Sequence, residues 1–189
     1  MLQSGSRDRR LTQAEVLDTA LRLVEAEGTE RLSMRRLAQE LGVTPMAIYR
    51  YVGNKEDLLQ RVADQVLNKV RRDRGQTWQE HLRFNGIATW RALSQYPGLA
   101  TFLLNRPLTA EARRNVDTMV HELEEAGLDH SRAEMAWEAY HTYIYGLVAL
   151  ESRFGPGRQS RDSRQKRLEF GLAVWVSGLE AQLAEPGTD

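Results

Sequence analysis

Residues 44–55, T-P-M-A-I-Y-R-Y-V-G-N-K, place an arginine, two tyrosines and a lysine on a segment of about three helical turns. If Ile48 and Val52, four residues apart, face the interior, Arg50 points outward beside the tyrosines. A guanidinium can donate two hydrogen bonds to guanine, while tyrosine hydroxyls and a lysine ammonium suit phosphate oxygens. These residue types at this spacing favour contact with double-stranded DNA. The alternative is that the same side chains only cover the edge of a core.

The helices that would hold this segment have clear start and stop signals. Ser33 caps a helix that Gly42 ends, and Thr44-Pro45 opens the next with a cap residue followed by proline at the first helical position. A longer helix precedes both and starts at the capping box T-Q-A-E (12–15). Two short helices joined by a glycine-containing turn, behind a longer helix, predict a helix-turn-helix domain of three helices, as in homeodomains.

The recognition helix of such a domain places its N-terminal residues against base edges in the major groove. We expect Arg50 to read guanine and the apolar residues after Thr44 to contact thymine methyl groups. The hydroxyls and Lys55 should anchor phosphates. The predicted DNA-binding residues are Ser33, Arg35, Thr44, Pro45, Met46, Ala47, Tyr49, Arg50, Tyr51 and Lys55.

Charge is distributed unevenly along a chain whose net charge is zero. Residues 1–75 hold 14 Lys/Arg and 11 Asp/Glu, whereas residues 76–189 hold 12 and 15. Residues 31–55 alone hold five basic residues and one acid, so an anionic partner would meet positive charge there. The chain has no cysteine, no apolar run near the ~20 residues of a membrane span, and no signal-peptide-like start. We therefore expect a cytoplasmic protein without a membrane partner.

Residues 12–60 resemble the TetR family of bacterial transcriptional repressors. The resemblance is carried by A-E-G-T-E-R-L-S-M-R-R-L-A-Q-E-L-G-V and I-Y-R-Y-V-G-N-K-E-D-L-L. It implies an all-α homodimer with a helix-turn-helix domain, expected over 10–56, and a larger ligand-binding and dimerisation domain, expected over 57–185. It also implies that a small effector releases the protein from DNA. A two-fold dimer predicts a palindromic operator.

The second half reads as further helices, and no segment of the chain reads as a convincing strand. It resembles the tetracycline repressor subgroup through W-Q-E-H-L-R-F-N-G-I (78–87), R-A-L-S-Q-Y-P-G (91–98) and N-R-P (105–107). That resemblance places Asn85 where the repressor uses an asparagine on its drug. In that resemblance, the histidine that ends the repressor's fourth helix falls near Lys69–Val70 here, and the repressor's metal-binding histidine corresponds to Phe102. We therefore expect no metal and no cofactor.

Aromatic residues are concentrated in the second half, where they must fill a helical core and line any ligand cavity. A planar or hydrophobic effector is expected. The residues predicted to bind it are His81, Asn85, Thr89, Phe102, Trp137, Tyr140 and Tyr143.

Two faces are expected at the dimer interface, one with Ala136, Tyr140, Tyr143 and Leu147 and one with Gly171, Val174, Trp175 and Gly178. The alternative is that they pack within one subunit.

No catalytic motif is recognisable, so an enzyme is not expected. Two alternatives stay open beside a repressor. One is a ligand-responsive activator. The other is a helical small-molecule-binding protein whose first domain makes protein contacts.

Overall fold

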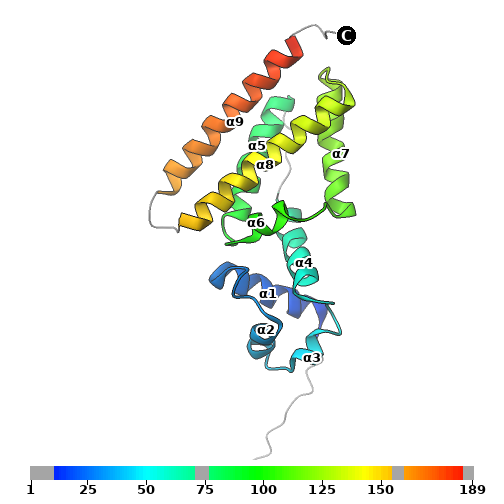
Figure 1. The fold of residues 1–189 in the computed structure, drawn as a ribbon, viewed down its shortest axis with the longest axis vertical. Coiled ribbons are helices and arrows are strands. Elements are labelled where there is room, and N and C mark those ends of the chain that lie inside the picture. The colour runs from blue at the N-terminus through cyan, green and yellow to red at the C-terminus, as the bar shows by residue number, and fades with distance from the viewer. Residues whose placement is uncertain (1–10, 71–76, 155–159, 185–189) are drawn as a thin grey trace, which may run out of the picture. The chain divides into compact units, whose positions relative to one another are not determined.

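The computed structural model describes residues 11–70, 77–154 and 160–184. Every regular element within these ranges is a helix, which confirms the all-α class (Figure 1). The helices are α1 (Gln13–Glu27), α2 (Met34–Leu41), α3 (Pro45–Ile48), α4 (Lys55–Asn68), α5 (Trp78–Leu93), α6 (Leu99–Leu104), α7 (Ala110–Glu125), α8 (His130–Phe154) and α9 (Arg161–Ala184).

The chain forms two compact units, Met1–Val62 and Ala63–Asp189. The division falls inside α4, so one helix belongs to both units. The domain ranges predicted from the sequence, 10–56 and 57–185, put the boundary in the first turn of the same helix. Among the described helices, none carries an apolar stretch long enough to cross a bilayer.

In the first unit, α2 packs against both α1 and α3. The capping box of α1 is present, since Thr12 Oγ1 accepts from the amide of Glu15 (3.2 Å) and the Glu15 carboxylate accepts from the amide of Thr12 (3.0 Å). Ile48 and Val52 are fully buried, as their spacing predicted. Their burial fixes which side chains of α3 remain at the surface.

The helix α3 is shorter than the sequence predicted. Regular helix ends at Ile48, and the chain continues as turns in which the amide of Tyr51 bonds to the Ile48 carbonyl (2.9 Å). That bond spans three residues instead of four, which tightens the helix end before Gly53. Thr44 also makes no side-chain cap hydrogen bond, contrary to its predicted role.

In the second unit, α8 is the central helix and packs against α5, α6, α7 and α9 (Figure 1). The buried Tyr140 of α8 donates a hydrogen bond to the Leu82 carbonyl of α5 (2.5 Å). A Cβ at Gly86 of α5 would come within 2.9 Å of the Tyr140 hydroxyl, so glycine permits this close approach. This contact holds α5 and α8 on either side of the cavity described below.

The faces predicted for the dimer interface are partly buried in the subunit and partly at its surface, where Val174 and Gly178 are exposed. Tyr140 and Leu147 are buried within the single chain, and Trp175 packs against Tyr140 with ring centroids 5.3 Å apart. Tyr143 donates to the Arg167 carbonyl (3.1 Å), and its ring fills the space beside Gly171. The small residue at 171 therefore admits a tyrosine of the same chain.

Candidate DNA interface and ligand cavity

The turn between α2 and α3 orients the predicted recognition segment. Ser33 Oγ accepts from the amide of Arg36 (3.0 Å) and so caps α2, and Gly42 ends α2 with a left-handed backbone at φ +67°. A residue with a Cβ is strained at that φ, so glycine suits the turn. The chain then enters α3 at Pro45, whose missing N–H costs nothing at a first helical position.

Several predicted DNA-binding residues present free groups at the surface. Met46 is 74% exposed and Tyr49 is 48% exposed. Arg35 and Arg50 are exposed, and among the described residues neither guanidinium has an ion-pair or hydrogen-bond partner. Thr44 and its neighbours Pro45 and Ala47 lie at the start of the helix, with the first two exposed and Ala47 half-buried. This side of the first unit offers charge, hydroxyl groups and apolar surface together.

Other members of the predicted set already have partners. The Tyr51 hydroxyl donates to the Leu11 carbonyl and thereby ties the turn after α3 to the residue that precedes α1. Lys55 Nζ donates to the Glu30 carbonyl at 3.4 Å, a long bond that leaves the ammonium other donors. A phenol has one hydrogen to donate, so Tyr51 cannot donate to a phosphate while it holds Leu11.

Arg36 makes ion pairs within the first unit and is therefore assigned a structural role. It bridges Glu27 of α1 (2.7 Å) and Glu40 of α2 (2.8 Å), and the hydrogen bonds that its guanidinium donates, first to Glu27 and then to Glu40, raise its pKa. The pairing leaves Arg35 and Arg50 as the arginines of α2 and the α3 turn without a carboxylate partner in the described chain.

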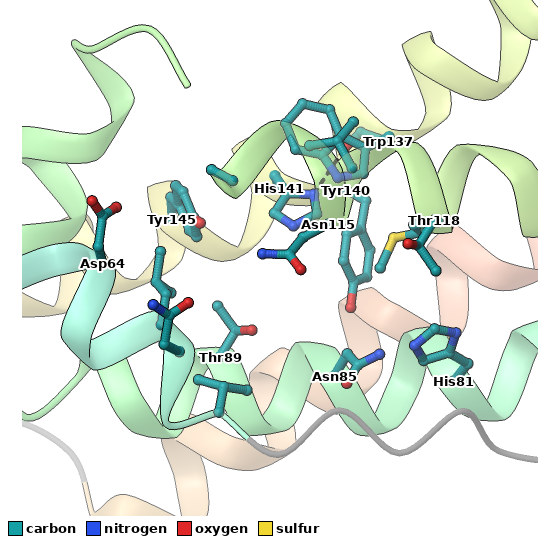
Figure 2. A pocket seen from close by; sticks show the side chains of 16 residues that line it. Asp64, His81, Asn85, Thr89, Asn115, Thr118, Trp137, Tyr140, His141 and Tyr145 are labelled. Carbon is teal, nitrogen blue, oxygen red and sulfur yellow. Dashed lines mark hydrogen bonds between the residues drawn. The ribbon is translucent and has the colours of Figure 1, made fainter. Parts of the chain in front are cut away.

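The second unit contains a cavity of about 250 Å³, bounded by α4, α5, α7 and α8 (Figure 2). Its walls mix apolar side chains with amides, hydroxyls and imidazoles, the usual make-up of a small-molecule site. The lining residues are Asp64, Leu67, Asn68, Val70, His81, Asn85, Thr89, Ala112, Asn115, Val116, Thr118, Met119, Trp137, Tyr140, His141 and Tyr145.

One wall of this cavity carries two polar side chains of α5, His81 and Asn85, which share a helix face at i and i+4. Both are buried, and Figure 2 shows them side by side near the hydroxyl end of Tyr140. His81 Nδ1 bonds to the carboxylate of Glu122 in α7. Neither amide atom of Asn85 has a hydrogen-bond partner within the described chain. A buried amide without partners costs about 1–3 kcal/mol, which a bound ligand can recover.

The opposite wall is aromatic. The Trp137 and His141 rings lie 4.4 Å apart at 36°, and the Tyr140 and Tyr145 rings meet the same imidazole edge-on. His141 Nδ1 donates to the Trp137 carbonyl (3.1 Å), which fixes the ring in place. Burial raises the pKa of Tyr140 far above its ordinary value, so its hydroxyl stays protonated. A flat ligand would find ring faces here.

The cavity gathers His81, Asn85, Thr89, Trp137 and Tyr140 from the set predicted to bind the effector. Phe102 and Tyr143 are placed elsewhere. Phe102 lies on α6 under the Arg106 guanidinium, 5.2 Å from the ring centroid, and Tyr143 lies against α9.

Asp64, Asn68, Asn115, His141 and Tyr145 line the cavity without having been predicted. The spacing of His141, four residues after Trp137 on the same helix, could have predicted that both line the cavity. The sequence around the lining residues of α4 and α7 carries no comparable pattern.

Metal ligation has little support in this unit. Within the described residues no three His, Cys, Asp or Glu side chains gather closely enough to hold an ion. Phe102, at the position that the sequence resemblance pairs with a metal-binding histidine, offers no ligand atom.

Comparison with known proteins agrees with this architecture. Residues 16–62 match the family described as bacterial regulatory proteins, tetR family, and residues 72–168 match the tetracyclin repressor-like C-terminal domain. These matches define a class of protein in which a regulatory helix-turn-helix domain is followed by a helical domain of the tetracyclin repressor type. The chain belongs to the tetR family, and its C-terminal half is of the tetracycline repressor type.

Individual relatives fit the same picture. The tetracycline repressor protein class D of Escherichia coli is 32% identical over 74% of this chain and 66% of its own length. The chain spans between 61% and 66% of the length of the first two curated relatives it matches. Both are described as a regulator or a repressor.

Two solved structures show what similar folds bind. BioQ with its double-stranded DNA operator is 29% identical, with a TM-score of 0.76 over 90% of this chain and 99% of that chain. ActR of Streptomyces coelicolor in complex with actinorhodin is 26% identical, with a TM-score of 0.79 over 93% and 99%.

Proposed function

We propose that this protein is a dimeric repressor that binds a palindromic operator and leaves it when a small molecule fills the cavity of the second unit. The observation that carries the proposal is α4. This helix begins at Lys55, beside the DNA-binding segment, and its last turns supply Asp64, Leu67 and Asn68 to the cavity wall. One helix thus carries residues of both sites.

The DNA contact is proposed to follow the free groups of the first unit. Arg50 pairs with guanine, Met46 and Pro45 meet thymine methyls, and Arg35, Thr44, Tyr49 and Lys55 hold phosphates. Exposure and the lack of internal partners support Arg35 and Arg50 in these roles. Operator binding by BioQ, a protein of similar fold, supports the same reading.

The effector is proposed to contact His81, Asn85, Thr89, Trp137 and Tyr140. A ligand that favours one position of α4 changes the separation of the two recognition helices in the dimer. Such coupling is typically ~1–3 kcal/mol, and it is reciprocal, so DNA must weaken effector binding by the same factor. The binding of actinorhodin by ActR is consistent with a cavity of this kind.

The dimer contact is proposed to lie on the outer stripes of α8 and α9. Exposed apolar residues recur there at helical spacing: Met135 (58% exposed) and Leu150 (47%) on α8, and Phe170 (73%) and Val174 (58%) on α9. A Cβ at Gly146 or Gly178 would meet no atom within 4 Å in the single chain. A second copy that covers both stripes would complete a four-helix bundle.

Selection of bound duplexes from a random DNA pool, at stated salt, tests this function. A palindromic motif is expected, and retention should fall when an effector is added. A featureless pool with weak, salt-sensitive retention would contradict sequence-specific recognition.

Two other functions remain distinguishable. An activator would bind the same motif but raise transcription of a linked promoter. A small-molecule-binding protein whose first unit contacts another protein would leave no DNA footprint, and its partner binding would be insensitive to salt. The exposed Arg35 and Arg50 favour DNA over that alternative.

A further inference from the structure

The cavity wall on α5 contains a histidine backed by a carboxylate. Glu122 accepts only, so His81 Nδ1 carries the hydrogen between them. Glu122 does not line the cavity, whereas His81 does, so the carboxylate lies behind the imidazole. The directions of the two ring nitrogens diverge, and Nε2 therefore points away from Glu122. No hydrogen-bond partner for Nε2 is found in the described part of the chain.

This arrangement defines the chemistry of His81. With Nδ1–H held by a carboxylate, Nε2 of the neutral ring is an acceptor. If Nε2 takes up a proton, the Glu122 carboxylate stabilises the resulting imidazolium. A ligand hydroxyl of sufficient acidity would thus donate to Nε2 and could pass its proton to it.

Asn85, one helical turn from His81, places a second requirement on the polar groups of the ligand. Its side chain is buried, and Nδ2 and Oδ1 are both without partners in the described residues. Nδ2 is a donor that a ligand oxygen would satisfy, and Oδ1 an acceptor for a ligand N–H or O–H. Because His81 and Asn85 are neighbours on one helix face, the groups that satisfy them must lie close together on the ligand.

We infer that the effector is a planar aromatic compound with an acidic ring hydroxyl beside a second oxygen, and that it binds by transferring the hydroxyl proton to His81. The O–H bond of the ligand breaks, an N–H bond forms at Nε2, and the phenolate stays paired with the imidazolium. The second oxygen accepts from Asn85 Nδ2. This inference rests on the proposed function only in taking the cavity as the effector site.

The remaining walls suit such a ligand. Trp137 and His141 line the cavity with aromatic rings, against which a flat molecule can pack. The other titratable side chains in the lining are Asp64 of α4 and Tyr140, His141 and Tyr145 of α8. The described lining contains no Lys or Arg, and it contains the carboxyl group of Asp64. A ligand that enters neutral and ionises against His81 fits these charges better than a permanent carboxylate.

The test uses 1,2-dihydroxyanthraquinone, whose colour changes when its 2-hydroxyl ionises, and its 2-methyl ether, which cannot ionise there. Both are titrated by absorbance into the DNA-free full-length protein, at a pH where the free dihydroxy compound is protonated. We expect the bound dihydroxy compound to show the spectrum of its ionised form. We also expect it to bind about 10-fold or more tightly than the ether, the usual advantage of a charge-assisted hydrogen bond.

The variants separate His81 from the rest of the cavity. His81→Gln should bind both compounds alike, with the spectrum of the neutral form, and Glu122→Gln should reduce the ionised fraction. His141→Gln is the matched control, because His141 lines the same cavity with its Nδ1 hydrogen held by the Trp137 carbonyl, and it should keep the preference for the hydroxyl. Unchanged affinity for the ether in His81→Gln would show that the cavity is intact.

Three results overturn the inference. They are equal affinity of the wild-type protein for both compounds, a neutral spectrum of the bound dihydroxy compound, and a hydroxyl preference that survives in His81→Gln. None of them involves DNA. A featureless DNA selection alongside an ionised bound probe would reject the regulator and keep the cavity chemistry. A palindromic motif alongside equal affinities would do the reverse.

Discussion

The hydroxyl of Tyr143 in α8 lies where a side chain at Gly171 of α9 would begin. The same hydroxyl shares its one hydrogen between the carbonyls of Arg167 (3.1 Å) and Leu168 (3.4 Å). The two helices are therefore joined at this point by a tyrosine that only a glycine admits.

Gly171→Ala should lower the free energy of unfolding by about 1–3 kcal/mol, since an inserted methyl group must displace the Tyr143 ring. Chemical denaturation measures the change. In a Tyr143→Ala background the space is open, so Gly171→Ala should cost little there, and the double-mutant cycle should show strong coupling. Additive effects would mean that the contact between these residues does not limit stability.

The pKa of His130 should lie above the ordinary value of a histidine. The hydrogen bond that His130 Nδ1 donates to the Glu124 carboxylate (2.7 Å) raises the pKa of His130, and the same bond lowers that of Glu124. A raised pKa in the folded state stabilises the protein below the unfolded value of 6.5, and this contribution disappears as pH rises through the folded value.

The ring-proton resonance of His130, followed by NMR from pH 5 to 9, gives this pKa directly. In Glu124→Gln the midpoint should move down toward 6.5. The same variant should be less stable than wild type below the wild-type midpoint and similar to it above. A midpoint that does not change in Glu124→Gln would assign the shift to another group.

The sequence predicted the structure correctly where a short-range rule connects a residue type to one local conformation. The capping box at Thr12, the turn at Gly42 and the burial of Ile48 and Val52 follow from short-range rules, and the structure confirms them. The cavity was partly predictable for the same reason, since polar residues on one face of α5 mark a wall.

The side chains that the sequence placed wrongly are those whose position depends on a tertiary contact. Tyr49 and Tyr51 are both tyrosines of the turn after α3, and the sequence predicted a phosphate contact for each. The Tyr51 hydroxyl instead donates to the carbonyl of Leu11, 40 residues away. Tyr143 shares its helix with cavity residues but faces α9 because Gly171 leaves room for it. Helical periodicity gives the face of a residue on its own helix and does not identify which neighbour covers that face.

Phe170 should be essential for dimerisation if the outer stripes of α8 and α9 pair with a second copy. Phe170→Arg places a charge in the centre of the proposed contact and should produce a monomer at micromolar concentration in sedimentation experiments. Phe84→Arg is the matched control, because Phe84 on α5 is also exposed (44%) and lies off the stripes. A dimer that tolerates both substitutions would place the interface elsewhere.

Tyr49→Phe and Tyr51→Phe each remove one hydroxyl group, but they should have different effects on DNA binding and on stability. Tyr49→Phe deletes an exposed hydroxyl that has no hydrogen-bond partner among the described residues, so operator affinity should fall, with fold stability unchanged. Tyr51→Phe deletes the bond to Leu11, so stability should fall by about 1 kcal/mol while the salt dependence of DNA binding is retained. Thermal denaturation and fluorescence anisotropy with a labelled operator measure both. The opposite pattern would show that Tyr51 releases Leu11 to bind DNA.

Arg50 and Lys55 should separate base reading from phosphate anchoring. Arg50 is exposed and unpaired within the described chain, so its guanidinium is available to guanine, and Arg50→Ala should lose about 1–3 kcal/mol of discrimination at one operator position. Lys55 donates only weakly to the Glu30 carbonyl, and Lys55→Ala should weaken binding to all sequences alike.

The measurement is binding of the two variants to the selected operator and to a set of single-base changes, over a range of salt. Lys55→Ala should reduce the slope of log affinity against log salt by ~1, whereas Arg50→Ala should flatten the preference among the base changes. A uniform loss in both variants would mean that Arg50 also binds phosphate. Base preference would then have to come from the apolar residues at the start of α3, Pro45 and Met46, or from the shape of the duplex.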